Sequence, residues 1–283
     1  MFSYVFRKRY KMALSFLFTA FIATASAAEP VQQLYNGLQL NAKTNVDIAS
    51  LAERRVFLIV HGTLAHNGME IIDSLLSVLK EENEAALALT LSLNIDDRKG
   101  MFPCNLKHTH RHEDAGAEIA LWLDWLSAQG ATSVVLVGHS RGSIQVAEYL
   151  TSNQDKRVTQ AVLIAPPTAR KGSPQEISVD AQTGDIKLEK FLHCENATVT
   201  ASSYASYYGE HPTDSTLKTI AALSLPVKIF VGSKDDVVEA KGWESVTSSL
   251  PENVQISVIS GADHYFRDLY AYDIVENILD WAE

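Results

Sequence analysis

A serine between two glycines is the residue of this chain best suited to chemistry. It lies in the segment Gly138-His139-Ser140-Arg141-Gly142. A serine hydroxyl attacks a carbonyl carbon poorly unless it stands clear of the main chain and a base takes its proton. A sharp turn from a strand into a helix exposes the hydroxyl, but it leaves almost no room for side chains two residues before and two residues after. The two glycines meet that demand.

The flanking segments match such a turn. Residues 133–137 are uncharged and rich in valine, which is typical of a buried parallel strand. Residues 143–150 carry apolar side chains at helical spacing. Strand, turn and helix therefore follow in the required order, and Ser140 is predicted to be a nucleophile.

A nucleophilic serine needs a base, and His264 is the best placed of nine histidines. It follows the last predicted strand, residues 254–259, and precedes the last predicted helix, residues 267–282. Parallel sheets form their sites where the strands end, so a loop at this point returns to the same edge as Ser140.

The acid that orients the base is expected just after the strand at residues 227–231. Asp235 and Asp236 both stand there, and they point in different directions, so only one of them can face His264. Asp235 is preferred and Asp236 remains the alternative. Asp263 is a poorer choice, because neighbouring side chains on one backbone diverge.

The negative oxygen of a tetrahedral intermediate needs preorganised donors. One is expected to be the main-chain N–H of Arg141, at the start of its helix. The other is expected after the first predicted strand, in His61-Gly62-Thr63, from the N–H of Thr63 or alternatively of Leu64. Gly62 allows close approach of the main chain, and His61 is expected to brace this loop rather than to transfer protons.

Together, these motifs resemble those of the α/β-hydrolase superfamily, over residues 55–282. The resemblance is carried by His61-Gly62-Thr63 and by the segments 138–142, 232–238 and 261–264. It implies hydrolysis of a small-molecule ester or related acyl substrate through an acyl-enzyme, with no metal or organic cofactor. It does not choose between an esterase, a peptidase, a thioesterase and an acyltransferase.

The order of elements predicts one α/β domain over residues 28–283. Strands that alternate with helices imply a mostly parallel central sheet with helices on both faces. A small cap-like insertion is expected at about 168–222, where the pattern is least regular. The predicted strands are 55–60, 87–93, 133–137, 158–165, 227–231 and 254–259, and the predicted helices are 71–79, 113–126, 143–150, 240–250 and 267–282.

The N-terminal segment has the features of a secretory signal peptide. Basic residues between positions 7 and 11 precede an apolar run at 12–23 and the small residues Ala25-Ser26-Ala27. Cleavage is expected after Ala27, which would make the mature protein secreted or periplasmic. An uncleaved anchor is the alternative.

The charge balance excludes several classes of partner. The chain has 24 Lys and Arg against 34 Asp and Glu. Cleavage of the leader would remove basic residues and no acidic ones, so the mature protein would be more acidic still. An acidic protein repels nucleic acid and anionic lipid, so neither is expected as a partner. After the leader, no apolar run is long enough to predict a membrane span. The oligomeric state stays open.

Two cysteines follow the leader, Cys104 and Cys194. In an oxidising compartment they are expected to pair, and two free thiols are the alternative.

Three histidines alternate in the loop before the second predicted helix, at His108, His110 and His112. If the loop were extended they would share one face, which is the basis of an alternative hypothesis: a metal-binding or interaction protein on a hydrolase frame. The preferred interpretation is that this loop forms a wall of the substrate pocket. The residues expected at that pocket are His61, His108, His139 and Tyr207, and a place in the core of the cap is the equal alternative for Tyr207.

Overall fold

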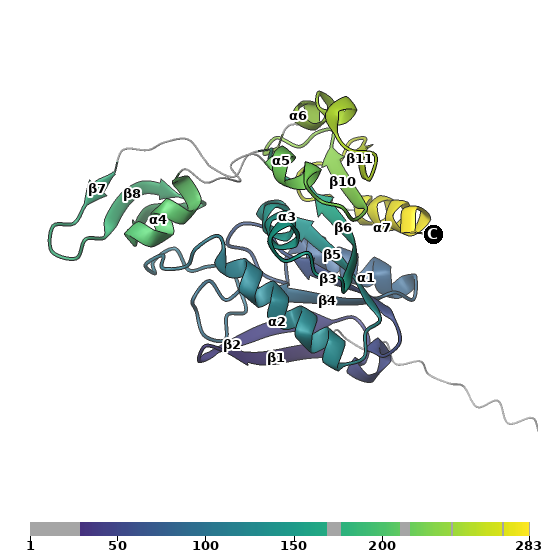
Figure 1. The fold of residues 1–283 in the computed structure, drawn as a ribbon. Coiled ribbons are helices and arrows are strands. Elements are labelled where there is room, and N and C mark those ends of the chain that lie inside the picture. The colour runs from purple at the N-terminus through teal and green to yellow at the C-terminus, as the bar shows by residue number, and fades with distance from the viewer. Residues whose placement is uncertain (1–28, 169–176, 210–215, 239, 268, 283) are drawn as a thin grey trace, which may run out of the picture.

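The computed structural model describes residues 29–168, 177–209, 216–238, 240–267 and 269–282 (Figure 1). The predicted leader, 1–27, lies outside the described residues, as do parts of the predicted cap. In the described part of the chain, no helix is both long and apolar enough to cross a membrane.

A mostly parallel sheet of eight strands forms the centre of the molecule (Figure 1). Its order is β1-β2-β4-β3-β5-β6-β10-β11, and all neighbours from β4 to β11 are parallel. This arrangement confirms the predicted fold class. The strands are β1 Glu29–Tyr35, β2 Leu38–Thr44, β3 Arg55–Val60, β4 Ala85–Thr90, β5 Ser133–His139, β6 Val158–Ile164, β10 Val227–Gly232 and β11 Val254–Ile259.

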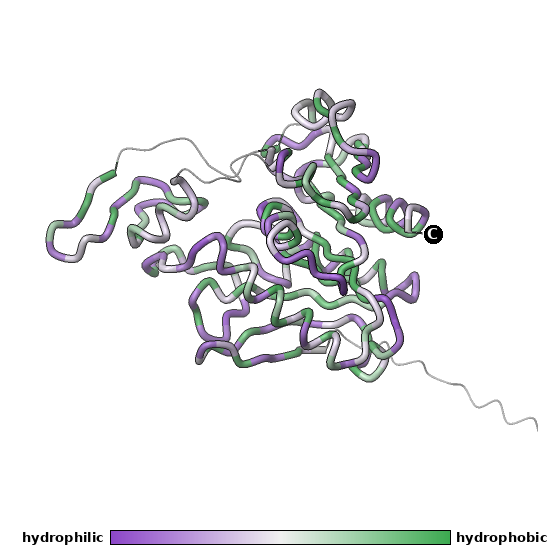
Figure 2. Tube along the Cα trace, viewed as in Figure 1, coloured by the Kyte–Doolittle hydropathy of each residue, from purple (hydrophilic) through white to green (hydrophobic). Residues whose placement is uncertain are grey.

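Helices cover both faces of this sheet (Figure 1). Within β3, Phe57 and Ile59 pack with α1 (Glu70–Glu81) and α7 (Tyr270–Ala282). The alternate residues of β3 join the core beneath α2 (Asp114–Ala128) and α3 (Arg141–Asn153). Because neither face of the central strands β3, β4 and β5 meets water, these strands are buried and mostly apolar along their length, as the hydropathy colouring of Figure 2 illustrates.

The antiparallel hairpin of β1 and β2 was not among the predicted elements. Its two-residue turn is Asn36-Gly37, and both residues have positive φ, 51° and 80°. Asn-Gly is the preferred sequence for a type I′ hairpin turn, so a local signal was present.

Three predicted elements have other bounds in the structure, among them the last helix, expected at 267–282, which is α7 and begins at Tyr270. The strand expected at 87–93 is β4, and it ends at Thr90, because Leu93 and Asn94 adopt positive φ and turn the chain out of the sheet. The helix expected at 240–250 is the short α6 (Ala240–Glu244), followed by a 3₁₀ turn at Thr247–Ser249. Valine, threonine and serine in that stretch are poor helix formers.

A second, antiparallel sheet lies within the predicted cap and beside the main sheet (Figure 1). It consists of β7 Ser178–Val179, β8 Ile186–Phe191 and β9 Cys194–Val199, and α4 (Ala201–Tyr208) and α5 (Thr216–Ala221) follow it. Buried residues of β8 and β9 such as Phe191 belong to the same core cluster as α2 and α3. The small sheet is therefore packed onto the main body.

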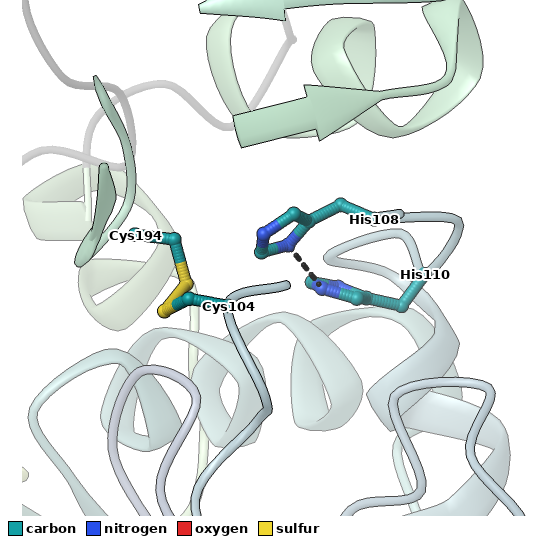
Figure 3. The surroundings of a disulfide bond; sticks show 4 residues. All are labelled: Cys104, His108, His110 and Cys194. Carbon is teal, nitrogen blue, oxygen red and sulfur yellow. Dashed lines mark hydrogen bonds between the residues drawn. A yellow bond between two sulfur atoms is a disulfide. The ribbon is translucent and has the colours of Figure 1, made fainter. Parts of the chain in front are cut away.

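A disulfide joins Cys104 to Cys194 and confirms the expected pairing (Figure 3). It fixes the loop before α2 to the start of β9. His108, four residues after Cys104, adds two main-chain hydrogen bonds. Its N–H donates to Thr198 O at 2.8 Å, and the Thr200 N–H donates to His108 O at 3.0 Å. The loop is thus held to the small sheet by covalent and main-chain bonds.

The double variant Cys104→Ser/Cys194→Ser is expected to lose about 2–4 kcal/mol of unfolding free energy, measured by urea titration followed by circular dichroism. The reason is that the bond restricts the unfolded chain across a sequence separation of 90. Dithiothreitol should shift wild type toward the variant and leave the variant unchanged. Equal midpoints for the variant and oxidised wild type would contradict this expectation.

Candidate active site

Ser140 lies at a tightly constrained turn between β5 and α3. It has φ 53° and ψ −123°, and its N–H donates to Ile164 O at 2.8 Å. A Cβ on Gly138 would lie 2.6 Å from the main chain of Gly142, and a Cβ on Gly142 would lie 2.5 Å from His61 O. Both positions therefore require glycine, as the sequence pattern predicts.

The structure brings Ser140, His264 and Asp235 into one hydrogen-bonded series. His264 Nε2 is 3.0 Å from Ser140 Oγ, and His264 Nδ1 is 2.8 Å from Asp235 Oδ2. The three residues come from the ends of β5, β10 and β11, and all three are buried. Asp236 is exposed, so Asp235 is the carboxylate that faces the imidazole.

Asp235 is set up to remain ionised. Its Oδ1 accepts the N–H groups of Val237 and Val238 at 2.8 Å and 2.7 Å. Burial alone would raise the pKa of Asp235, but the hydrogen bonds from His264 and these two amides offset it, and the net pKa is lowered. A carboxylate at Nδ1 holds the proton there and leaves Nε2 free to accept one from Ser140.

The loop after β3 lies directly beside the serine. A Cβ on Gly62 would be 3.2 Å from Ser140 Cβ, so only a residue without a side chain fits comfortably. The next residue, Thr63, accepts a hydrogen bond at Oγ1 from Arg141 Nε, at 3.1 Å. Leu64 follows with a φ of 55°. The two segments predicted to donate to an oxyanion are therefore adjacent.

His61 and His139, both expected at the pocket, are buried and bind main-chain atoms. His61 Nδ1 donates to Gly62 O at 2.8 Å, and its Nε2 accepts the Leu91 N–H at 3.0 Å, which matches the bracing role. His139 Nε2 lies 2.9 Å from His264 O, so it supports the loop of the base. Burial is the main cause that lowers the pKa of His61 to about 3 and that of His139 to about 4.

The three loop histidines do not converge on one point. His108 Nδ1 and His110 Nε2 hydrogen-bond at 3.1 Å (Figure 3), whereas His112 Nε2 lies 3.1 Å from Glu148 Oε2 on α3. Among the residues that the structure describes, no group of three or more His, Cys, Asp and Glu is arranged to hold a metal ion. Their geometry does not support the alternative of a metal site built from all three imidazoles.

The structure packs both His108 and Tyr207 inside the protein. For His108 this differs from the expected place in a pocket wall, and for Tyr207 it agrees with the alternative of a place in the core. The His108 ring stacks on Phe102 with centroids 4.4 Å apart and meets Phe191 edge-on at 4.9 Å. The Tyr207 hydroxyl hydrogen-bonds with His110 Nδ1 at 2.9 Å. The aromatic neighbours from β8 and the disulfide-linked loop explain why these polar side chains are covered.

Sequence reasoning missed His193, in the turn between β8 and β9. Partial burial lowers the pKa of His193, and the charges of Arg141, Lys190 and His264 lower it further. These interactions indicate that the turn lies near Arg141 and His264, at the carboxyl end of the parallel strands. No local pattern marks His193, because its position depends on how the small sheet packs.

The chain is similar to known proteins both in its sequence pattern and in its fold. A family model described as serine hydrolase matches residues 105–264, which include Ser140, Asp235 and His264. A search of curated proteins finds no match.

Solved structures match over most of the chain at low identity. Est1E from Butyrivibrio proteoclasticus has a TM-score of 0.66 and 16% identity, over 89% of this chain and 98% of its own. A thioesterase domain from the curacin biosynthetic pathway has a TM-score of 0.62 and 12% identity, over 90% of this chain and 100% of its own. An alpha-beta serine hydrolase homologue from Coxiella burnetii has a TM-score of 0.55 and 16% identity, over 94% of this chain and 99% of its own. These likenesses confirm the α/β-hydrolase fold.

Gly142→Ala is expected to destabilise the protein by about 3 kcal/mol, because the new methyl group would collide with fixed carbonyl oxygens of β3 and His61. The matched control is Gly116→Ala within α2, where the nearest atom to the added Cβ is Tyr149 Cδ2 at 3.9 Å. That change is expected to be neutral or stabilising, because alanine favours helix. Denaturant midpoints measure both. Similar effects of the two substitutions would contradict the steric account of the turn.

The buried histidines predict acid lability. His61, His108, His110 and His139 have pKa values lowered, chiefly by burial, to between about 3 and about 4. The unfolded chain takes up protons near pH 6.5, while the folded protein does not. Stability should therefore be full above pH 6.5 and fall toward pH 4, by about 1.4 kcal/mol per pH unit for each group.

Urea unfolding between pH 7.5 and pH 4.5 measures this loss. His139→Gln keeps an N–H donor toward His264 O without titrating, so its stability should depend less steeply on pH. An unfolding free energy that is constant or rises over this range would contradict the expectation.

Proposed function

Because the chain belongs to the serine hydrolase family, we propose that it hydrolyses a small-molecule ester or related acyl substrate with Ser140 as the nucleophile. His264 is the general base and Asp235 the acid that orients it. The observation that carries the proposal is the continuous series of contacts from Asp235 Oδ2 through both nitrogens of His264 to Ser140 Oγ.

In the first half of the reaction, His264 Nε2 takes the proton of Ser140 while Oγ bonds to the acyl carbon. The developing imidazolium is stabilised by Asp235, which two amides and the imidazole keep ionised. The oxyanion accepts from the main-chain N–H groups of Arg141 and Thr63. His264 then protonates the leaving group, and the carbon–oxygen bond to it breaks.

In the second half, water attacks the acyl-enzyme. His264 removes a proton from that water, the second tetrahedral intermediate uses the same two amides, and Ser140 leaves with the proton held by His264. The acid product departs and the starting state is restored. Every step uses the chain's own side chains and amides.

An acyl substrate is supported by the names of the structural neighbours, which include an esterase domain from a Rhodothermus marinus protein and the thioesterase domain. The excess of Asp and Glu makes a polyanionic substrate less favourable. We further propose that the protein acts outside the cytoplasm. The features of the leader and the Cys104–Cys194 bond support this, since disulfides persist in oxidising compartments.

Ser140→Ala is expected to abolish labelling by a fluorophosphonate probe and to lower kcat for p-nitrophenyl acetate by at least about 10³-fold. The matched control is Ser152→Ala, at an exposed position of α3, which should be labelled and turn over like wild type. A panel of an ester, a thioester and an amino-acid anilide identifies the preferred acyl bond. Equal turnover by wild type and Ser140→Ala would reject the proposal.

The two candidate acids allow a second comparison. Asp235→Asn should lower kcat by about 10³–10⁴-fold. The asparagine amide would not stabilise the imidazolium, and it would not hold the neutral imidazole in the tautomer with its proton on Nδ1. Asp236→Asn should change kcat by less than about twofold, since Asp236 is exposed and the carboxylate at His264 Nδ1 is that of Asp235. A large loss of kcat in Asp236→Asn with little change in Asp235→Asn would instead assign the orienting role to Asp236.

A further inference from the structure

We propose that the Arg141 side chain is a positioning residue that clamps two segments together. It holds the loop after β3 that contains Gly62 and Thr63, called the oxyanion loop, against α4 and against the loop that carries His108, His110 and His112, called the histidine loop. The inference rests on the proposed function, in which the Arg141 and Thr63 amides hold the oxyanion. The same residue would then supply one donor through its main chain and fix the loop of the other donor through its side chain.

The first part of the clamp is the contact with Thr63. Arg141 Nε donates to Thr63 Oγ1 at 3.1 Å. A threonine side chain is branched at Cβ, so fixing Oγ1 restricts χ1 and with it the adjacent main chain. The preceding residue is Gly62, which adds no side chain of its own to hold the loop in place. The guanidinium is charged at every working pH, so the restraint is permanent.

The second part is the support behind the guanidinium. Its Cζ lies 5.2 Å from the centroid of the Tyr207 ring, and Nη1 lies 3.5 Å from His112 Nδ1. A cation over an aromatic face is attracted to it, so α4 helps to hold the guanidinium. The other nitrogen of the same ring, His112 Nε2, lies 3.1 Å from Glu148 Oε2 on α3. Arg141 therefore touches two elements besides the oxyanion loop.

The third part is the anchoring of these supports. Tyr207 is buried, and its hydroxyl is bound to His110, which in turn binds His108 (Figure 3). The main chain of His108 pairs with β9, and the disulfide joins the same loop to the same strand. The clamp thus connects the packing of the small sheet to the geometry of the oxyanion loop.

A contact of Arg141 with the substrate would give a different kinetic signature. Losing a group that binds the ground state raises KM, whereas losing alignment of an oxyanion donor lowers kcat. Removal of one such donor costs about 10²–10³-fold in kcat, and a misplaced loop should cost part of that. We therefore expect about a 10- to 100-fold loss of kcat, with KM within about twofold of wild type.

The experiment measures kcat and KM with p-nitrophenyl acetate, and the rate of inactivation by a fluorophosphonate, for Arg141→Met, Thr63→Val and the double variant. Thr63→Ser keeps the hydroxyl and should retain most of the activity that Thr63→Val loses. The double variant should be no slower than the slower single variant, because both changes break one interaction. Arg157→Met is the control, since Arg157 pairs with Asp124 and Asp155 away from these residues.

Additive losses, a change confined to KM, or equal activity of Thr63→Val and Thr63→Ser would overturn the clamp. If Arg141→Met fails to fold, the comparison of Thr63→Val with Thr63→Ser decides the question alone. Ser140→Ala separates the two proposals. Retained turnover in that variant would reject the proposed function. Lost turnover in Ser140→Ala, together with a normal kcat in Thr63→Val and Arg141→Met, would reject the clamp only.

Discussion

The structure depends on how closely three stretches of main chain approach one another around Ser140. The carbonyl of His61 and the main chain of Gly142 lie so near that a single methyl group would not fit between them, and Gly62 lies against the serine itself. This crowding holds Ser140 at a φ of 53° and directs its hydroxyl toward His264. The parallel strands supply the rigidity, since β3, β5 and β6 are paired side by side on both sides of the turn.

The histidines of this chain perform opposite tasks in similar surroundings. His61, His108, His110 and His139 are buried with their pKa lowered, and their ring nitrogens act as fixed neutral hydrogen-bonding groups. His264 is also buried, but it alone among these faces a carboxylate that is held ionised by two amides. Burial is therefore common to all five histidines. What distinguishes His264 from the other four is the carboxylate at its Nδ1.

The residues of the site were predictable where a local rule links sequence position to the sheet edge. Ser140, Asp235 and His264 each follow a recognisable strand, and parallel strands bring their carboxyl ends together, so their meeting followed from order alone. The choice between Asp235 and Asp236 required the direction of each side chain. Asn36-Gly37 carried a local hairpin signal that was not used.

The histidine loop was harder to predict because distant residues determine its environment. Phe191 and Tyr207 cover His108 and His110, and they reach them only through the packing of the small sheet. No spacing rule relates these segments. The same reason explains why the position of His193 and the contacts of the Arg141 side chain could not be predicted from the sequence.

The disulfide divides the three residues of the hydrogen-bonded series into two groups. It closes a covalent ring from Cys104 to Cys194, and Ser140 lies inside that ring, whereas Asp235 and His264 lie on the chain beyond it. Loss of the pairing between β6 and β10 would therefore separate Ser140 from both partners while the ring stays closed. In the oxidised protein, the hydrogen-bonded series thus requires an intact β6–β10 pairing, which the disulfide cannot replace.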